Sequence, residues 1–265
     1  MPRFIVPFIT KLFLLGVMVI ALFQTSFAAD ETHPFFIAGD EDEPPFGFIK
    51  SNNEFSGIFV DIMKEACARL NIPLKHLPYP WVRAQYLVKS GEADAIITVP
   101  TDERMKFLSP TRESVIDFQW VAFVRKDNPK YKQMRSFTKI SDFKGYKVLD
   151  YIGDGWGEQN LKGLDVDRNG NYQQALLRLA GKRGDVFIFT KVATKYLLTE
   201  MIRNPEYKNM GLEMVTDLPN ILYAQGFHLL ISKTSPYASM IPQFDNVLAE
   251  MKADGTIQAI ISKYL

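Results

Sequence analysis

The chain has 265 residues, 47% of them hydrophobic, which is enough for one large domain or two lobes with a sizeable core. Its 31 basic and 30 acidic residues nearly balance, so the charge gives no indication of a nucleic-acid or membrane-surface partner. The single cysteine, Cys67, permits no disulfide within the chain, and on its expected helix we predict a buried free thiol. The histidines His33, His76 and His228 are widely separated, so no metal site is expected.

The N-terminus has the layout of a secretory signal peptide. The basic residues Arg3 and Lys11 precede an apolar run over residues 12–23, and the small residues Ser26 and Ala28 follow it. A membrane anchor is the alternative, but spanning a bilayer takes about 20 apolar residues. We therefore expect cleavage after residue 28, release into the periplasm, and a mature chain with 29 basic and 30 acidic residues.

The first third of the mature chain alternates strands and helices. The helix over residues 58–70 is predicted because its apolar residues recur every three or four positions, and Asn71 suits its C-cap. Around it we expect an acidic, Pro-containing loop at 40–49, a turn at 51–57, a helix at 82–91, and strands at 33–39, 73–80 and 93–99. This order predicts a parallel sheet covered by helices.

The alternation restarts after a longer strand at residues 117–128. We expect a Gly-rich turn and short helix at 154–163, strands at 146–153, 185–189 and 227–232, and helices at 171–184, 192–202, 240–255 and 256–265. The restart indicates a second α/β lobe, with crossings between lobes at residues 124–129 and 220–227. Lobe 1 would comprise residues 29–124 and 225–265, and lobe 2 residues 125–224.

Four sequence segments occur in a recognisable order. They are FIAGDEDEPPFGF, FSGIFVDIMKEACARLNI, GEADAIITVPTDERMKFLSP and the closing LLISKTSPYASMIPQFDNVLAEMKADGTIQAIISKYL. In this order they resemble the family 3 periplasmic solute-binding proteins, the receptors of polar amino-acid ABC importers, over residues 34–265. The resemblance implies a two-lobed α/β fold of type II, with the ligand in a cleft between lobes joined by two crossings and closed by a hinge motion. It also implies a monomer without cofactors that serves the membrane subunits of an ABC importer.

Arg104 is the first candidate for ligand contact. The resemblance implies that this arginine, in a Thr-x-x-Arg turn, holds a ligand carboxylate with its planar fork of donors, with Thr98 and Thr101 adding hydroxyl contacts. Pairing with Asp102 or Glu103 at the surface is the alternative. The approach to the turn is two residues shorter than in amino-acid binders and lacks their serines, a departure from the family pattern.

The remaining first-lobe candidates surround this turn. Trp81 falls where amino-acid binders carry an aromatic ring that lies flat on the ligand, although a core tryptophan is the alternative. Arg83 is either a second arginine of the cleft or a solvated residue. Asp40 and Glu43 either receive a cationic tail of the ligand or belong to a solvated acidic loop. Phe46 is expected to shape the cleft wall.

In the second lobe, GDGWGEQ stands where the family has a Gly-Thr/Ser turn at a helix N-terminus that receives a carboxylate. Here Asp154, followed by Gly155 and Trp156, occupies that turn, and an aspartate attracts an ammonium instead. Thr190 falls where amino-acid binders usually carry the aspartate that pairs with the α-amino group. A threonine supplies no such charge, so recognition of an α-amino group is weakened unless Asp154 substitutes for that aspartate.

The sequence therefore favours a periplasmic protein that binds a small polar ligand with a carboxylate, an amino acid or a derivative, for an ABC importer. A dehydratase-like enzyme of the same fold is one alternative, with Glu43, Arg83 and Asp154 as candidate groups, although no nucleophile–base pair or metal pattern supports it. A sensing module that reports to a separate membrane partner is the other.

Overall fold

A computed structural model describes residues 33–168 and 170–265, and the predicted signal peptide lies outside them. Residues Phe35–Leu265 form one compact unit. Its strands are β1 (Phe35–Asp40), β2 (Asp42–Glu43), β3 (Gly47–Ile49), β4 (Phe55–Ser56), β5 (Leu74–Tyr79), β6 (Ala95–Thr98), β7 (Leu108–Arg125), β8 (Lys147–Asp150), β9 (Asp165–Arg168), β10 (Val186–Thr190) and β11 (Val215–Ser232). Its α-helices are α2 (Ile58–Arg69), α3 (Trp81–Ser90), α4 (Asp102–Met105), α5 (Tyr131–Met134), α6 (Gly155–Asn160), α7 (Tyr172–Ala180), α8 (Lys191–Arg203), α9 (Ile241–Ala253) and α10 (Thr256–Ser262).

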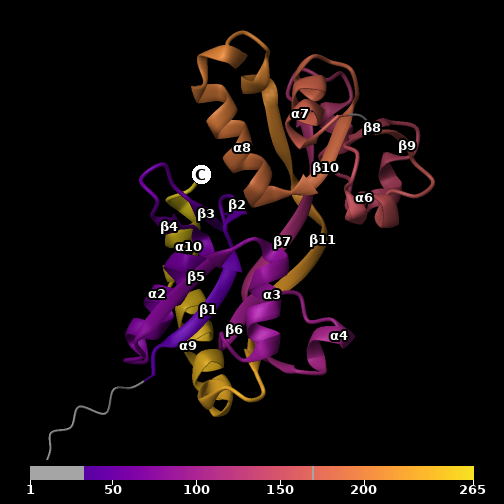
Figure 1. Cartoon of the computed structure of the whole chain (residues 1–265). Coiled ribbons are helices and arrows are strands. Elements are labelled where there is room, and N and C mark those ends of the chain that lie inside the picture. The colour runs from indigo at the N-terminus through magenta and orange to yellow at the C-terminus, as the bar shows by residue number, and fades with distance from the viewer. Residues whose placement is uncertain (1–32, 169) are drawn as a thin grey trace, which may run out of the picture. The chain divides into compact units, whose positions relative to one another are not determined.

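Eight strands form one sheet in the order β5-β1-β6-β11-β7-β10-β8-β9 (Figure 1). The strands β5, β1 and β6 pair in parallel at one end of this order, and β10, β8 and β9 pair in parallel at the other. Between them the two 18-residue strands β7 and β11 pair antiparallel. The long pair thus joins two groups of parallel strands within one sheet, and the alternation of strands and helices predicts such groups. The short strands β2, β3 and β4 form a separate sheet.

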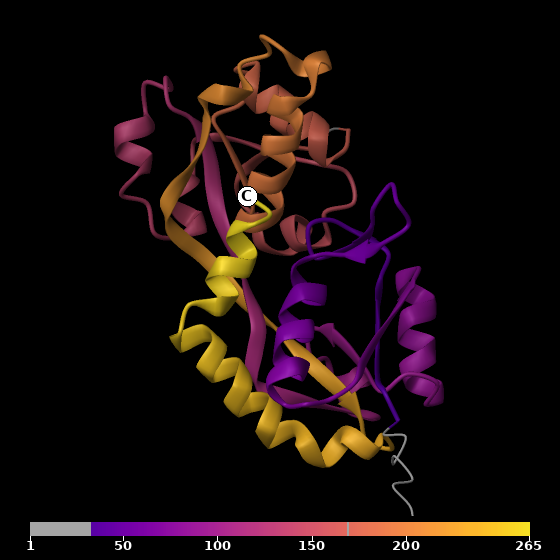
Figure 2. The ribbon, with the colours of Figure 1, turned by 90° about the vertical axis from the view of Figure 1, so that its left-hand side faces the viewer.

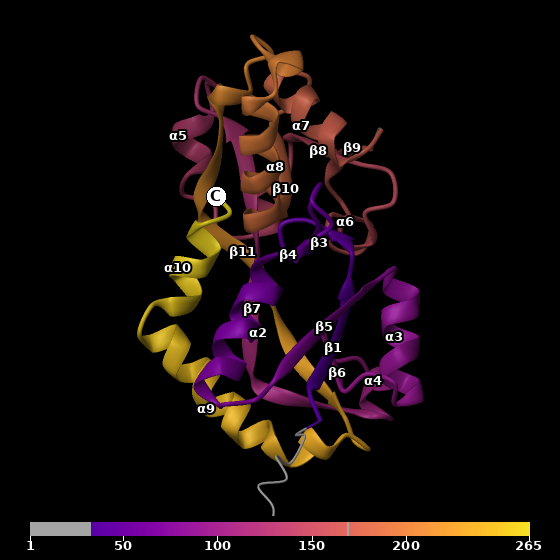
Figure 3. The same ribbon diagram turned by 60° about the vertical axis from the view of Figure 1, so that its left-hand side comes forward.

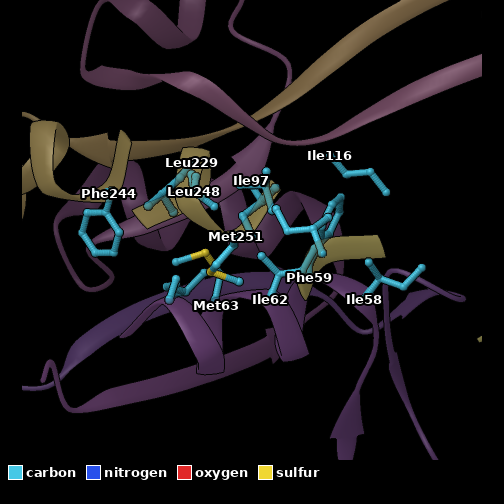
Figure 4. Packing of buried hydrophobic residues seen from close by; sticks show 14 of the residues in the cluster. Ile58, Phe59, Ile62, Met63, Ile97, Ile116, Leu229, Phe244, Leu248 and Met251 are labelled. Carbon is cyan, nitrogen blue, oxygen red and sulfur yellow. The ribbon is translucent and has the colours of Figure 1, made fainter. Parts of the chain in front are cut away.

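The hydrophobic cores follow the same division. One set of buried side chains comes from segments before Val121 and after Phe227, and another comes from the segments between them. In the first set, α2 turns its apolar side chains toward α9 and β6 (Figure 4). Helix α10 also packs against α2 (Figures 2 and 3). The labelled side chains of the contact between α2, α9 and β6 include Ile58, Phe59, Ile62, Met63, Ile97, Phe244, Leu248 and Met251. Each contributes about 1.5–3 kcal/mol when fully buried.

The helix ends follow the turn residues. Asn71, one residue beyond the C-cap Leu70 of α2, adopts a φ of 54°, and Gly91 ends α3 with a φ of 84°. Both values lie in the left-handed region that Gly and Asn tolerate best. Cys67 on α2 is a buried free cysteine, as predicted, and burial raises the pKa of its thiol to about 12.

The long strands begin earlier than the sequence patterns predict. β7 begins at Leu108 instead of residue 117, and β11 begins at Val215 instead of residue 227. Their additional length comes from pairing with each other along most of their course, not from a local alternation of apolar residues. Residues 120–123 pair with β10, a strand of the predicted lobe 2. We therefore propose that the first crossing lies near residues 117–119, before the predicted range of 124–129. The lobe boundaries remain predictions.

Candidate functional site

Arg104 is held in place by its own lobe. Thr101 caps the short helix α4, and its hydroxyl accepts a hydrogen bond from the Arg104 amide (3.4 Å). The guanidinium donates from Nη1 to the Val99 carbonyl (2.9 Å) and from Nη2 to Oε1 of Gln85 (3.1 Å). Its central carbon lies 5.5 Å from the centre of the Trp81 ring. Since an arginine has five N–H donors, three remain for a ligand.

The alternative role of Arg104 as a surface ion pair is not found. Within the described residues, Arg104 has no acidic partner, and Glu103 pairs with Lys106 instead. Partial burial lowers the pKa of Arg104 below its usual value, but a guanidinium remains protonated at neutral pH. Arg104 therefore carries a positive charge that no carboxylate of the described chain neutralises.

Thr98 and Arg83 occupy different surroundings. Thr98 ends β6, is only 5% exposed, and lies opposite His228 of β11. Arg83 is exposed, and its guanidinium lies 4.7 Å from the ring of Tyr79, whereas Arg104 lies on Trp81. Arg83 thus contacts Tyr79 and is not part of the Arg104–Trp81 group.

Asp40, Glu43 and Trp81 line one partly enclosed cavity of about 30 Å³, together with His76 and mainly apolar residues. This volume holds about one or two water molecules. Burial, and then the negative charge of Asp40, raise the pKa of Glu43 to about 7. Burial lowers the pKa of His76 to about 4, so its ring is neutral. Both acids of the first loop therefore lie beside the aromatic ring that Arg104 covers.

Phe46 lies in the core and not on an exposed wall. Its side chain is 2% exposed and packs on Phe118 and Phe59, with ring centres 4.4 and 5.3 Å apart. The ring therefore fixes the loop that carries Glu43 to the core beneath it. The apolar residues of the segment PPFGF do not indicate whether Phe46 lies in the core or on the wall of the cleft.

Asp154 is used inside the second lobe. Its Oδ1 accepts a hydrogen bond from the Trp156 amide (3.0 Å) and so caps α6, and its side chain is 4% exposed. It lies beside the fully buried Asp150, whose Oδ2 is 2.9 Å from Nε of Arg168. Burial, and also the charge of Asp154, raise the pKa of Asp150 to about 6. Sequence reasoning missed Asp150, which lies within the strand predicted at residues 146–153 and ends the observed strand β8.

The other second-lobe candidates gather around Trp120. Trp156 stacks on Trp120 with ring centres 5.0 Å apart and an interplanar angle of 21°, and Tyr223 lies against both rings. Thr190, which is 6% exposed, pairs with Trp120 in the sheet. Trp156 also packs against the first-lobe core. Trp120 and Tyr223 were not predicted, although both lie in segments expected near the crossings.

Gly155 opens α6, and no atom of the described residues lies within 4 Å of the position that a Cβ would occupy there. The predicted residues thus form two groups: Arg104, Trp81, Asp40 and Glu43 in the first lobe, and Trp156 with Thr190 at the crossing strands.

In residues 33–168 and 170–265, no cluster of three or more His, Cys, Asp or Glu side chains is arranged to hold a metal ion. No helix in these residues is long and apolar enough to cross a membrane.

Comparison with known proteins identifies the family to which the chain belongs. The model of the bacterial extracellular solute-binding proteins, family 3, matches residues 36–265. The chain is 28% identical over 227 residues to the ABC transporter arginine-binding protein 1 of Escherichia coli K12, covering 83% of this chain and 86% of that protein. It is 22% identical to the L-cystine-binding protein TcyJ of the same strain, covering 95% and 94% of the two chains.

Solved structures share the fold. The second substrate-binding domain of Lactococcus lactis GlnP, in an open conformation, matches with a TM-score of 0.69 and 19% identity over 91% of this chain and 98% of that one. The second substrate-binding domain of an amino-acid ABC transporter from Streptococcus pneumoniae matches with a TM-score of 0.68 and 21% identity over 87% of this chain and 99% of that one. The chain therefore belongs to the family 3 bacterial extracellular solute-binding proteins and has their two-lobed type II fold.

Proposed function

We propose that the protein captures a small amino acid or amino-acid derivative with a carboxylate and a cationic group, and presents it to the membrane subunits of an ABC importer. The surroundings of Arg104 are the observation that supports a carboxylate on the ligand. Its guanidinium is oriented by Val99, Gln85 and Trp81, and it has no acidic partner in the described chain. A fixed fork of free donors beside an aromatic ring suits a planar anion.

The two acids Asp40 and Glu43 support a cationic group on the ligand. Asp40 and Glu43 line the cavity that also borders Trp81, so a ligand lying on this ring would reach acids at one end and Arg104 at the other. The name of the arginine-binding relative supports a basic amino acid as the ligand. Thr190 offers no charge for an α-amino group, so the two first-lobe acids would supply the recognition of a cation.

The location and partners follow from the family and the N-terminal sequence. The family is extracellular, and the predicted signal peptide at residues 1–28 would direct the chain to the periplasm. We infer that the mature protein acts there as a monomer, that its two lobes close on the ligand, and that the importer recognises the closed form.

A thermal-shift screen of the mature chain tests the proposal. Arginine, lysine and ornithine are expected to raise the melting temperature, since a ligand at 100 times its Kd stabilises the folded state by about 2.7 kcal/mol. Agmatine, which has the guanidinium of arginine without its carboxylate, is the matched control and should give no shift. A shift with agmatine as large as with arginine would contradict the role of Arg104, and no shift with any basic amino acid would contradict the ligand class.

The dehydratase-like alternative is disfavoured by the placement of its candidate groups. Arg83 lies on Tyr79, Asp154 caps α6, and Glu43 lies in the first-lobe cavity. We therefore expect reversible binding without chemistry. Recovery of the bound amino acid unchanged after prolonged incubation with the protein would support this, whereas product formation that is lost in Glu43→Gln would establish the enzyme.

A further inference from the structure

We propose that Glu43 is a specificity-determining residue that couples the capture of a cationic ligand to the release of a proton. In the empty site its carboxyl group is partly protonated, and it ionises when the cationic group of the ligand pairs with it. The inference rests on the proposed function, because it concerns the acids that would meet a basic amino acid.

The cavity walls disfavour two separate negative charges. Glu43 and Asp40 line a partly enclosed space of about 30 Å³ whose other walls are mainly apolar or aromatic. These walls come from β1, β3, β4, α2, α3, β5 and β6, and include Ile37, Phe55, Phe59, Trp81 and Ile97. A carboxylate loses hydration in such surroundings, and a neighbouring carboxylate opposes its ionisation further.

No positive charge among the lining residues compensates for the two acids. Asp40 on β1 is the acid that faces Glu43, and its Oδ1 accepts a hydrogen bond from the Asp42 amide. His76 on β5 is the other titratable group of the cavity, and burial keeps it neutral. Lys64 and Asp61 act on His76 with opposite effects. Glu43 therefore has a pKa of about 7 and exists as a mixture of both forms near neutral pH.

The exchange balances one charge against another. An ammonium or guanidinium group that pairs with Glu43 favours the carboxylate, and the displaced proton leaves to the solvent. If the pKa in the complex lies well below 6, binding releases about 0.9 proton at pH 6, about half a proton at pH 7 and about 0.1 proton at pH 8. The affinity for the cation then rises up to about tenfold per pH unit below pH 7 and levels off above it.

This exchange would distinguish ligands of the same shape. A neutral side chain has no charge to offer and leaves the Glu43 proton in place, so its affinity should not rise with pH in this interval. L-Arginine and L-citrulline form a matched pair, because both carry the same carboxylate and α-amino group and only arginine has a cationic guanidinium. Discrimination between them should increase as the pH rises from 6 to 7.5.

Isothermal titration calorimetry of the mature chain tests the proton count. Titrations with L-arginine at pH 6, 7 and 8, each in two buffers of different ionisation enthalpy, should give the release stated above, and L-citrulline should give none. Glu43→Gln should bind L-arginine more weakly and without proton release. Asp42→Asn is the matched control, because Asp42 is an exposed acid of the same loop, and it should retain the release.

Two results would overturn the inference while leaving the proposed function intact. One is binding of L-arginine with the same heat in both buffers at pH 7, and the other is an unchanged proton release in Glu43→Gln. If no basic amino acid binds, the proposed ligand class fails, and infrared titration of the ligand-free protein then decides the protonation of Glu43. The difference between wild type and Glu43→Gln should show a carboxyl group that titrates near pH 7, and titration below pH 5 would overturn the inference.

Discussion

If Arg104 binds a ligand carboxylate as proposed, its side chain is already oriented before the ligand arrives. Two of its donors are fixed by Val99 and Gln85, and its plane is supported by Trp81. An arginine on a free surface would lose rotamer freedom when it binds, whereas this one has already lost it during folding. Its charge therefore acts from a defined position, which is what a bidentate contact with a carboxylate requires.

Replacement of Arg104 should abolish binding with little effect on the fold. We expect Arg104→Ala to weaken binding of a basic amino acid by at least about 100-fold, because a charge-assisted bidentate contact is lost and the ligand carboxylate stays unpaired. Arg104→Lys should recover only part of the affinity, since an ammonium cannot form the planar fork. Calorimetric affinity and melting temperature measure both effects.

The exposed Arg112 of β7 is the matched control for this substitution. Arg112→Ala removes the same charge from another part of the chain, and it should leave the affinity unchanged. Unchanged affinity in Arg104→Ala would refute the carboxylate contact. A collapse of its melting temperature would instead assign Arg104 a structural role.

At the scale of elements, α6 depends on a glycine that packs over two acids. A Cβ at Gly157 would lie 2.6 Å from Oδ2 of both Asp150 and Asp154, which is closer than real contacts allow. The helix can therefore lie on this buried pair only with a glycine at that position. At Gly155, two residues earlier in the same helix, a Cβ would meet no atom of the described part of the chain within 4 Å.

These two glycines give a matched pair of variants. Gly157→Ala should lower the free energy of unfolding by about 1–3 kcal/mol, because the methyl group displaces carboxyl groups that are already confined. Gly155→Ala should be neutral or stabilise the protein by up to about 1 kcal/mol, since alanine favours the helix. Urea unfolding of both variants measures the difference, and equal effects would contradict the packing of α6 on Asp150 and Asp154.

The elements also show what the sequence can predict. The helices α2, α3, α7 and α9 lie close to their predicted ranges, because their apolar residues repeat with the helical period and their ends carry Asn or Gly. The starts of β7 and β11 were wrong, because these strands are defined by pairing with each other far along the chain. No local pattern carries that information.

The same limit applies to the candidate site. Arg104, Trp81, Asp40 and Glu43 follow strand ends of one parallel sheet, so their proximity could be predicted from the order of the elements. The position of Asp154 could not be decided in this way. An aspartate before a helix is both a possible ligand contact and a common N-cap, and the structure uses it as the N-cap.

For the molecule as a whole, the long pair β7–β11 connects both cores and passes beside the Trp120–Trp156 stack. The pairing of these two strands shifts register at several points between Asp217 and Leu230. Irregular pairing of this kind bends strands more readily than a continuous ladder does. We therefore expect the hinge motion at these shifts, where Trp156 can slide on Trp120 without exposing a core.

The protonation of buried acids also determines how the whole molecule responds to pH. Glu43 and Asp150 have pKa values raised to about 7 and about 6, so the folded protein holds these protons more tightly than the unfolded chain. Between about pH 4 and pH 7 these two acids lower the stability as the pH rises, whereas His76, whose pKa is lowered to about 4, raises it up to about pH 6.5 and offsets part of the fall. Asp127 and Asp254 have lowered pKa values and act in the opposite direction below about pH 4, but both are solvated and contribute little.

We accordingly expect the melting temperature of the ligand-free protein to fall from pH 5 to pH 7.5 and to level off above. Glu43→Gln should flatten the part of this slope between pH 6 and 7.5, because a neutral amide has no proton to lose. Saturating L-arginine should reduce the slope as well, since the guanidinium stabilises the ionised carboxylate that otherwise destabilises the fold at higher pH. Scanning calorimetry with and without L-arginine measures all three profiles. A melting temperature that rises steadily from pH 5 to pH 7.5 would show that the effect of His76 outweighs that of Glu43 and Asp150, which would contradict the expected profile.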